Sequence, residues 1–127
     1  MSDLLTRLLD SRRWLLADGA TGTNLFAYGL STGEAPELWN VEHPELVQRH
    51  YRGFVDAGAD LILTNSFGGN ARRLMLHGAQ DRVVELNRAA ARLAREVVDS
   101  VDRPVVVAGS IGPTGDLFQP LGPLSHP

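Results

Sequence analysis

Three short polar segments, residues 18–24, 64–70 and 109–115, contain the side chains best suited to bind a small ligand. Asp18 is the one carboxylate among them, and an aspartate can bind an ammonium group or orient a second polar group. Thr64 offers a hydroxyl group, which can hydrogen-bond a carboxylate or a carbonyl. These residue types therefore indicate recognition of a small molecule that carries an ammonium, a carboxylate or a carbonyl group.

The same residues also have structural interpretations, which stay open at this point. An aspartate before a glycine, as in Asp18-Gly19, commonly caps a turn through its own backbone. The hydroxyl and amide side chains of Thr64, Asn65 and Ser66 can close a strand without binding any ligand. Residue type alone therefore does not decide between a binding site and three well-closed turns.

Two other kinds of site are disfavoured. The glycines of segment 109–115 do not have the spacing of a dinucleotide-binding loop, and Pro113 stands where the following helix should begin. His50 lies on the apolar face of a predicted helix, while His43 and His77 flank a helix start and a glycine turn. We expect core or capping roles for these histidines rather than metal binding.

Apolar patterns predict the elements that position these segments. Apolar runs without polar alternation, at residues 14–17, 61–63 and 105–108, favour strands buried on both faces. Apolar residues at helical spacing predict helices over residues 46–55 and 81–100. Weaker patterns predict a helix before the first strand and a helical turn near residues 70–76, and the prolines and glycines of the tail predict a loop over 109–127.

The order of these elements indicates one fold class. A strand, a long connection with a helix, a strand, a helix and a strand form the βαβαβ pattern of a parallel sheet. Ligands of such sheets bind at the carboxyl ends of the strands, where the connecting loops meet. We therefore predict an α/β fold of parallel βα units in which the three polar segments form one composite site.

Composition limits the function classes. All 12 basic residues are arginines and cysteine is absent, which excludes a lysine Schiff base, a cysteine nucleophile, and a thiolate zinc site built from this chain alone. A net charge of -3 argues against nucleic acid as a partner, and no apolar run is long enough for a membrane span. The N-terminal residues lack a secretory pattern, so we expect a cytoplasmic protein. We expect Trp14 in the core, whereas Trp39, in a polar loop, is more open to a ligand.

Motifs spread along nearly the whole chain carry a resemblance to a known family. They are Leu16–Thr23, Glu42–Glu45 with Ala57–Asp60, Thr64–Phe67, and Ala108–Gly115. In this order they resemble the N-terminal part of the homocysteine S-methyltransferases, and most closely bacterial betaine-homocysteine S-methyltransferases. The resemblance implies that the chain forms about three strands of a (β/α)8 barrel, in which homocysteine lies at the carboxyl ends of the strands with its thiol on a zinc ion.

The resemblance also implies which residues bind the substrates, homocysteine and a methyl donor. Those near homocysteine are Asp18, Gly19, Thr64, Asn65 and Phe67, and those at the mouth where the donor enters are Gly109 and Ser110. The resemblance implies betaine or a similar donor, with S-methylmethionine or a methylfolate as alternatives. Donor identity stays open because animal betaine enzymes carry an aromatic residue directly after the phenylalanine matching Phe67, and here that residue is Gly68.

The zinc ligands of the family are cysteines from later strands, and this chain contains none of them. A barrel of this kind needs about 250 residues, so we interpret residues 1–127 as a partial homocysteine-binding domain that stops before the zinc-ligand strands. Without zinc a thiol is mostly protonated near neutrality, so we predict no significant turnover by the chain alone. The alternative is an inactive fragment or interaction module that self-associates or needs a separate C-terminal half, because its sheet would have an open edge.

Overall fold

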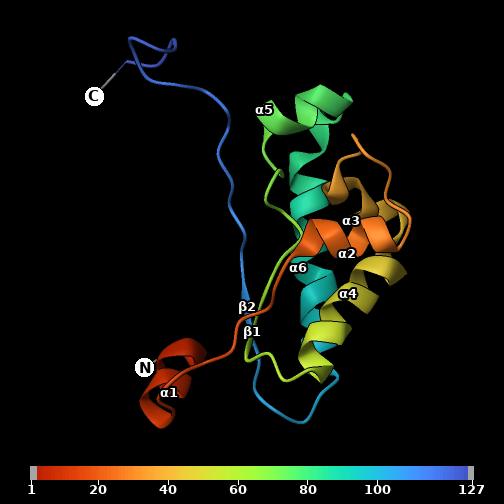
Figure 1. Ribbon diagram of the computed structural model, residues 1–127, viewed down its shortest axis with the longest axis vertical. Helices are drawn as coiled ribbons and strands as arrows, with labels where there is room; N and C mark the ends of the chain where they lie inside the picture. Colours follow the sequence, from red (N-terminus) through yellow and green to blue (C-terminus); the bar gives the residue numbers. More distant parts are fainter. Residues whose placement is uncertain (1–2, 126–127) are drawn as a thin grey trace.

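The structure is a computed structural model that describes residues 3–125. Within this range the α-helices are α1 (Leu4–Ser11), α2 (Thr21–Ala27), α3 (Trp39–Glu42), α4 (Pro44–Asp56), α5 (Ala71–Leu74) and α6 (Val83–Asp99). The strands are β1 (Leu61–Leu63) and β2 (Val106–Ala108), and 3-10 turns are η1 (Pro36–Leu38), η2 (Met75–His77) and η3 (Gln80–Arg82). Helices α2 to α6 gather on one side of β1 and β2, while α1 and the C-terminal tail lie on the other side (Figure 1).

The sheet is small and parallel. Strands β1 and β2 pair so that Leu61 lies opposite Val106 and Leu63 opposite Ala108. The predicted strand at residues 14–17 is wrong in extent, because only Ala17 pairs, through a single parallel bridge to Leu61. The protein is therefore an α/β fold in which β1 lies between the chain near Ala17 and strand β2.

The expectation that Trp14 belongs to the core is also wrong, since its side chain is 70% exposed. Leu16 is 48% exposed in the same segment. Both residues lie in the segment that leads from α1 to α2. A strand buried on both faces needs cover on both sides, and the described residues cover the sheet with helices on one side only.

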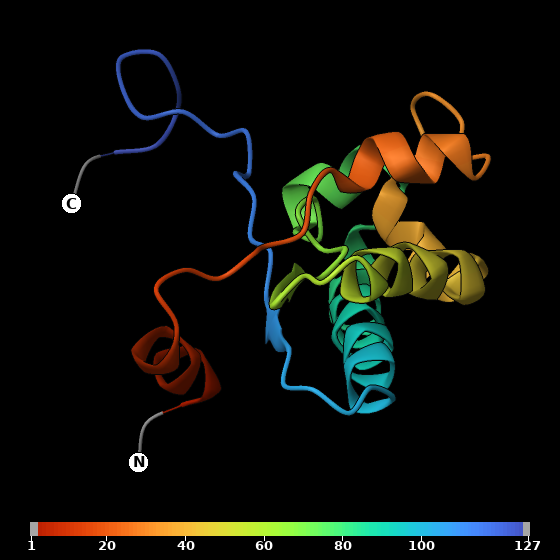
Figure 2. The ribbon, with the colours of Figure 1, turned by 60° about the horizontal axis from the view of Figure 1, so that its bottom comes forward.

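The two long helices form as the apolar pattern predicts. Helix α4 begins at Pro44, whose fixed φ suits a first turn, and buries Val47 and Tyr51. Helix α6 buries Leu93 and Val97 on the face that meets α4. The two helices pack on each other and on the sheet, α4 against β1 and α6 against β2 (Figure 2). Their shared core is the rigid support for the chain segments at the carboxyl ends of the strands.

Two features near α3 differ from the sequence-based expectations. No helix is predicted over residues 18–24, but α2 begins at Thr21 and buries Leu25 completely. Trp39, expected to be open to a ligand, is only 6% exposed and belongs to the core cluster. The centroid of its ring lies 4.9 Å from the centroid of the His43 ring, and the two rings are arranged edge to face. The η1 turn places Trp39 at the start of α3, where it faces the core instead of solvent.

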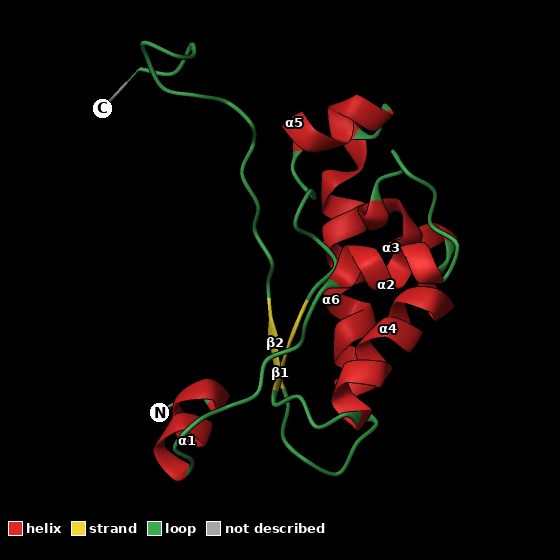
Figure 3. Cartoon of the chain, in the orientation of Figure 1, coloured by secondary structure: helices red, strands yellow, loops and turns green. Residues whose placement is uncertain are grey.

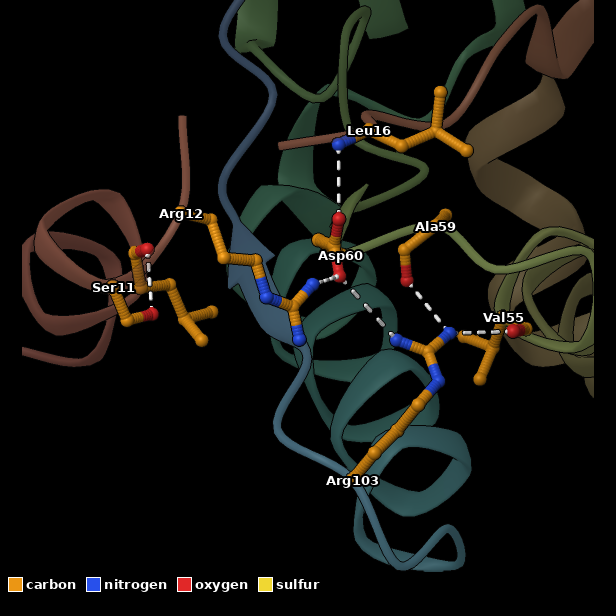
Figure 4. Close-up of polar contacts among 8 residues, drawn as sticks. Ser11, Arg12, Leu16, Val55, Ala59, Asp60 and Arg103 are labelled. Carbon is orange, nitrogen blue, oxygen red and sulfur yellow. Dashed lines mark hydrogen bonds and ion pairs between the residues drawn. The ribbon is translucent and has the colours of Figure 1, made fainter. Parts of the chain in front are cut away.

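A buried aspartate attaches the N-terminal segment to the sheet. The Oδ1 atom of Asp60 accepts a hydrogen bond from Arg12 Nη1 and lies 3.8 Å from Arg103 Nη1, while Oδ2 accepts from the backbone N–H of Leu16 at 3.0 Å (Figure 4). The Leu16 N–H, followed by Arg12 and Arg103, holds the pKa of Asp60 below its usual value. These contacts fix the chain just before Ala17 and thereby the position of Asp18.

The tail after β2 is a loop through the described residues, as predicted, apart from a single bridge between Phe118 and Leu124 (Figure 3). His50 is 1% exposed on α4, which confirms the expected core role. Among residues 3–125, no helix has the length and apolar character needed to cross a bilayer.

Candidate functional site

A cleft of about 520 Å³ opens beyond the carboxyl end of β1. Its walls come from the start of α2, the loop 33–37, the segment 65–68 after β1, parts of α5 and η2, and one residue after β2. Three of the predicted site residues line this cleft, namely Asn65, Phe67 and Ser110. Four others are not among its lining residues, namely Asp18, Gly19, Thr64 and Gly109. The structure therefore divides the predicted site into a lined cleft and a set of residues at the adjoining strand ends.

Asp18 has one satisfied and one unsatisfied carboxylate oxygen. Its Oδ2 accepts a hydrogen bond from the backbone N–H of Leu63 at 2.8 Å, and its own N–H donates to the Leu61 carbonyl at 2.9 Å. Its Oδ1 is buried and has no hydrogen-bond partner among the described residues. Burial raises the pKa of Asp18, against the effect of the Leu63 N–H. A buried acceptor without a partner is costly, and a ligand ammonium group would supply the missing donor.

A hydroxyl network joins the ends of β1 and β2. Ser66 Oγ donates to the Ser110 carbonyl at 2.8 Å, and Thr64 Oγ1 lies 2.6 Å from Ser66 Oγ. Because the single hydroxyl proton of Ser66 is used, Thr64 is the donor in the second contact. Thr64 Oγ1 also accepts from the Ser110 N–H at 3.0 Å. The network brings Thr64 and Ser110 together, as the composite-site prediction requires, and holds Ser110 at the cleft.

Asn65 is a buried structural connector that also contributes to the cleft wall. Its Nδ2 donates to the Pro36 carbonyl at 2.8 Å and to Asn40 Oδ1 at 3.0 Å. Its backbone N–H donates to Tyr51 Oη at 2.7 Å, and its carbonyl accepts from Asn40 Nδ2 at 2.8 Å. Burial raises the pKa of Tyr51 to about 12, so the phenol stays protonated near neutrality. The main role that these hydrogen bonds give Asn65 is structural, because they hold the loop that carries Pro36 next to the end of β1.

Phe67 presents an aromatic ring at the cleft. The side chain is 58% exposed, and the Phe67 carbonyl accepts from the Gly112 N–H at 3.0 Å. A Cβ atom added at Gly112 would lie 2.3 Å from that carbonyl oxygen, so this close approach requires glycine. The segment after β2 thus holds Phe67 in place through backbone contact.

Gly19 and Gly109 have different surroundings. A Cβ atom at Gly19 would lie 3.2 Å from the Phe54 ring, so glycine lets the chain after Asp18 pack closely on α4. A Cβ atom at Gly109 would meet nothing within 4 Å. The structure thus gives Gly19 a packing role, while the substrate roles of both glycines stay predictions.

Glu37 is a cleft residue that the sequence reasoning missed. It is only 6% exposed in the η1 turn, yet it lines the cleft, and its Oε1 accepts from the Gly68 N–H at 2.6 Å. A Cβ atom at Gly68 would lie 3.0 Å from Glu37 Oε1, which explains physically why glycine follows Phe67 here. The sequence signal for Glu37 was weak, because a glutamate after a proline is ordinary in an exposed turn.

The described residues do not fit a zinc ion. Between residues 3 and 125 there is no group of three or more His, Cys, Asp or Glu side chains that could hold a metal, and the sequence contains no cysteine. The zinc that the resemblance implies therefore has no ligand set in the part of the chain that the structure describes.

The fold and the site define an α/β protein whose candidate ligand site lies at the carboxyl ends of parallel strands. Polar groups follow Ala17, β1 and β2, and an aromatic ring lies at an adjoining cleft. The chain belongs to the homocysteine S-methyltransferase family, because the family model of that description matches residues 15–126. This confirms the family that the motifs indicate.

Relatives and solved structures agree with this assignment. The chain is 36% identical over 119 residues to a methionine synthase of Mycobacterium tuberculosis, covering 85% of this chain and 10% of that protein. It is 33% identical over 123 residues to the homocysteine S-methyltransferase of Escherichia coli, covering 87% and 39%. The crystal structure of the metallated homocysteine methyltransferase MmuM from Escherichia coli matches with a TM-score of 0.74 and 31% identity, covering 87% of this chain and 42% of that one. The chain therefore spans less than half the length of these relatives.

Proposed function

We propose that this chain takes part in methyl transfer to homocysteine, giving methionine, and that it supplies the N-terminal part of the amino-acid pocket. The observation that carries the proposal is the buried, unpartnered Oδ1 of Asp18 at a strand end, which suits the ammonium group of an amino acid. Family membership supports homocysteine as that amino acid. The Escherichia coli relative, named as a homocysteine S-methyltransferase, supports the same choice.

The reaction forms a bond between the homocysteine sulfur and the methyl carbon of the donor. The bond between that carbon and the donor's nitrogen or sulfur breaks, and its electron pair stays with the donor. The attacking group must be a thiolate, and a free thiol with a pKa of about 8.5 is mostly protonated near neutrality. The residues that the structure describes include no metal-binding group to deprotonate it. We therefore propose that this chain binds and orients homocysteine, and that thiol activation comes from polypeptide outside it.

The donor enters, in this proposal, at the cleft beside Phe67 and Ser110, so Phe67, which the resemblance places near homocysteine, is assigned to the donor side of the site. Both residues line it, and the Thr64 network fixes Ser110 there. We propose betaine or a similar small donor. A cleft of about 520 Å³ is large enough for a donor of this size.

A second candidate function rests on a separate observation. Leu16 is 48% exposed and Leu63 is 38% exposed, and both lie at the sheet, away from its helix-covered side. Exposed apolar groups and an open strand edge favour association with further polypeptide. In this reading the chain is an interaction module that is inactive until a C-terminal half, or a second copy, joins it.

Reconstitution tests the proposed function. The purified 127-residue chain is assayed for methionine formation from homocysteine and betaine, alone and with the zinc-loaded C-terminal part of a related methyltransferase. We expect no significant turnover by the chain alone and zinc-dependent turnover by the mixture. Asp18→Asn should remove most of the reconstituted activity, whereas Asp56→Asn, on the exposed end of α4, should not.

Two results would contradict the proposal. Turnover by the chain alone at the rate of a complete enzyme would show that thiol activation does not need other polypeptide. Equal reconstituted activity of the parent and Asp18→Asn would show that the aspartate does not hold the substrate. Sedimentation of the chain alone tests the second candidate function, the interaction module. A sheet with an exposed apolar side is expected to associate, so a compact and stable monomer would contradict this candidate.

A further inference from the structure

Glu37 is a buried carboxylate without a cation beside it. Its side chain is 6% exposed, and the Gly68 N–H is its hydrogen-bond donor, at 2.6 Å. None of the ion pairs between residues 3 and 125 includes Glu37. Arg73 and His77 line the same cleft without forming an ion pair to it. The carboxylate therefore lies at the cleft wall, where the Gly68 N–H is its hydrogen-bond partner among the described residues.

Such a position is costly unless a positive charge comes close. Removing a carboxylate from water is unfavourable, and a single N–H contact at Oε1 offsets only part of that cost. The Gly68 contact orients the group, because a Cβ atom at Gly68 would lie within 3.2 Å of both carboxylate oxygens. The Glu37 carboxylate can therefore approach the chain this closely only because position 68 is a glycine.

The aromatic ring of Phe67 indicates which class of cation suits the cleft. Phe67 directly precedes Gly68, lines the same cleft, and is 58% exposed. A quaternary ammonium or sulfonium group has no N–H to donate, so it is recognised by nearby negative charge and by aromatic faces rather than by hydrogen bonds. A carboxylate and an aromatic ring on one cleft provide both of these interactions.

The geometry points to Glu37 as the residue that selects a positively charged methyl donor, an ammonium or sulfonium compound, for this cleft. The inference rests on the proposed function and adds a specificity-determining residue to it. Glu37 acts on the donor, whereas Asp18 acts on homocysteine. The two assignments can therefore fail independently.

Donor binding tests the inference with an isosteric pair of probes. Glycine betaine and 3,3-dimethylbutanoate have the same shape and the same carboxylate, but only betaine has the positive charge. Titration calorimetry on the 127-residue chain should show betaine binding about tenfold more tightly than the neutral-headed isostere. Glu37→Gln keeps an acceptor for the Gly68 N–H, and it should reduce the ratio of the two affinities to nearly one.

Two further variants keep the test decisive if Glu37→Gln folds poorly. Gly68→Ala retains the Glu37 charge but displaces its carboxylate, so it should also weaken the preference for betaine. Glu34→Gln removes one negative charge from the same cleft, but Glu34 is exposed and already accepts from the Ser31 N–H, so most of the preference should remain. Circular dichroism of each variant checks that the helices are intact.

The outcomes separate the two proposals. An unchanged preference in both Glu37→Gln and Gly68→Ala would overturn the inference, as would equal binding of the two probes, or no binding of betaine, to the parent. An equal loss in Glu34→Gln would also overturn it, because net charge rather than position would then be responsible. Homocysteine binding that is absent in the parent while betaine discrimination persists would contradict the proposed function and leave the role of Glu37 supported.

Discussion

Replacing Asp60 with asparagine should detach the N-terminal segment from the sheet at a measurable cost in stability. The carboxylate accepts from Arg12 and from the Leu16 N–H, and it lies 3.8 Å from Arg103. Hydrogen bonds to a charged group contribute about 1.5–3 kcal/mol each. The Arg12 and Arg103 side chains are 45% and 35% exposed, so solvent screening reduces their share to about 0–1 kcal/mol each. Asparagine keeps one acceptor, and we expect a loss of about 2 kcal/mol.

Thermal unfolding followed by circular dichroism measures this loss. For a domain of this size the expected decrease in Tm is about 6 °C, while Asp56→Asn, at the exposed end of α4, should change Tm by less than about 2 °C. The pKa of Asp60 is lowered in the folded protein, so its stabilisation is complete above the unfolded value of about 3.9 and disappears as pH falls through the folded value. The difference in Tm between parent and variant should therefore narrow as the pH is lowered from about 6 to about 3. A pH-independent difference, or no difference at neutral pH, would refute the assigned role.

Other changes give distinct signatures. Asp18→Asn should raise the unfolding free energy at neutral pH, because burial raises the Asp18 pKa and the ionised carboxylate destabilises the folded state. This gain should vanish below about pH 4, where Asp18 is protonated in both the folded and the unfolded protein. An unchanged or lower Tm of Asp18→Asn at pH 7 would contradict this. Tyr51→Phe leaves the Asn65 N–H buried without its acceptor and should cost about 1–3 kcal/mol in urea unfolding, whereas Tyr28→Phe, on the partly exposed Tyr28, should cost less than about 0.5 kcal/mol.

The elements with regular apolar spacing could be predicted from the sequence. Helices α4 and α6 follow from a repeated apolar face, and their first turns and ends carry suitable residues such as Pro44 and Gly58. Strands β1 and β2 follow from short apolar runs between these helices. In each case the local pattern and the tertiary packing favour the same structure, so local reasoning was sufficient.

The elements near the site were harder to predict because tertiary contacts decide them. Glycine at position 22 disfavours a helix, and none is predicted there, yet Leu25 is completely buried and the packing of α2 outweighs the low helix propensity of glycine. The apolar run at Trp14 has a strand-like composition, but the described residues supply no helix to cover its outer side, so pairing stops at Ala17.

The candidate site also contains residues that the sequence pattern locates and residues whose position depends on tertiary contacts. The strand-end segments that carry Asp18, Thr64 and Ser110 could be located from the rule that ligands bind at the carboxyl ends of parallel strands. The network between Thr64 and Ser110 shows that two of these segments do meet. The inward position of Glu37 depends on the Gly68 backbone, thirty-one positions further along the chain, and no local pattern reports such a contact.

Titration calorimetry with two thiols tests whether Asp18 holds the ammonium group of homocysteine. L-homocysteine carries the ammonium group, and 4-mercaptobutanoate is the same molecule without it. We expect the parent chain to bind homocysteine at least about tenfold more tightly than the des-amino thiol. Asp18→Asn should abolish this preference, whereas Asp56→Asn should retain it. Equal affinity of the parent for both thiols, or an undiminished preference in Asp18→Asn, would contradict this role of Asp18.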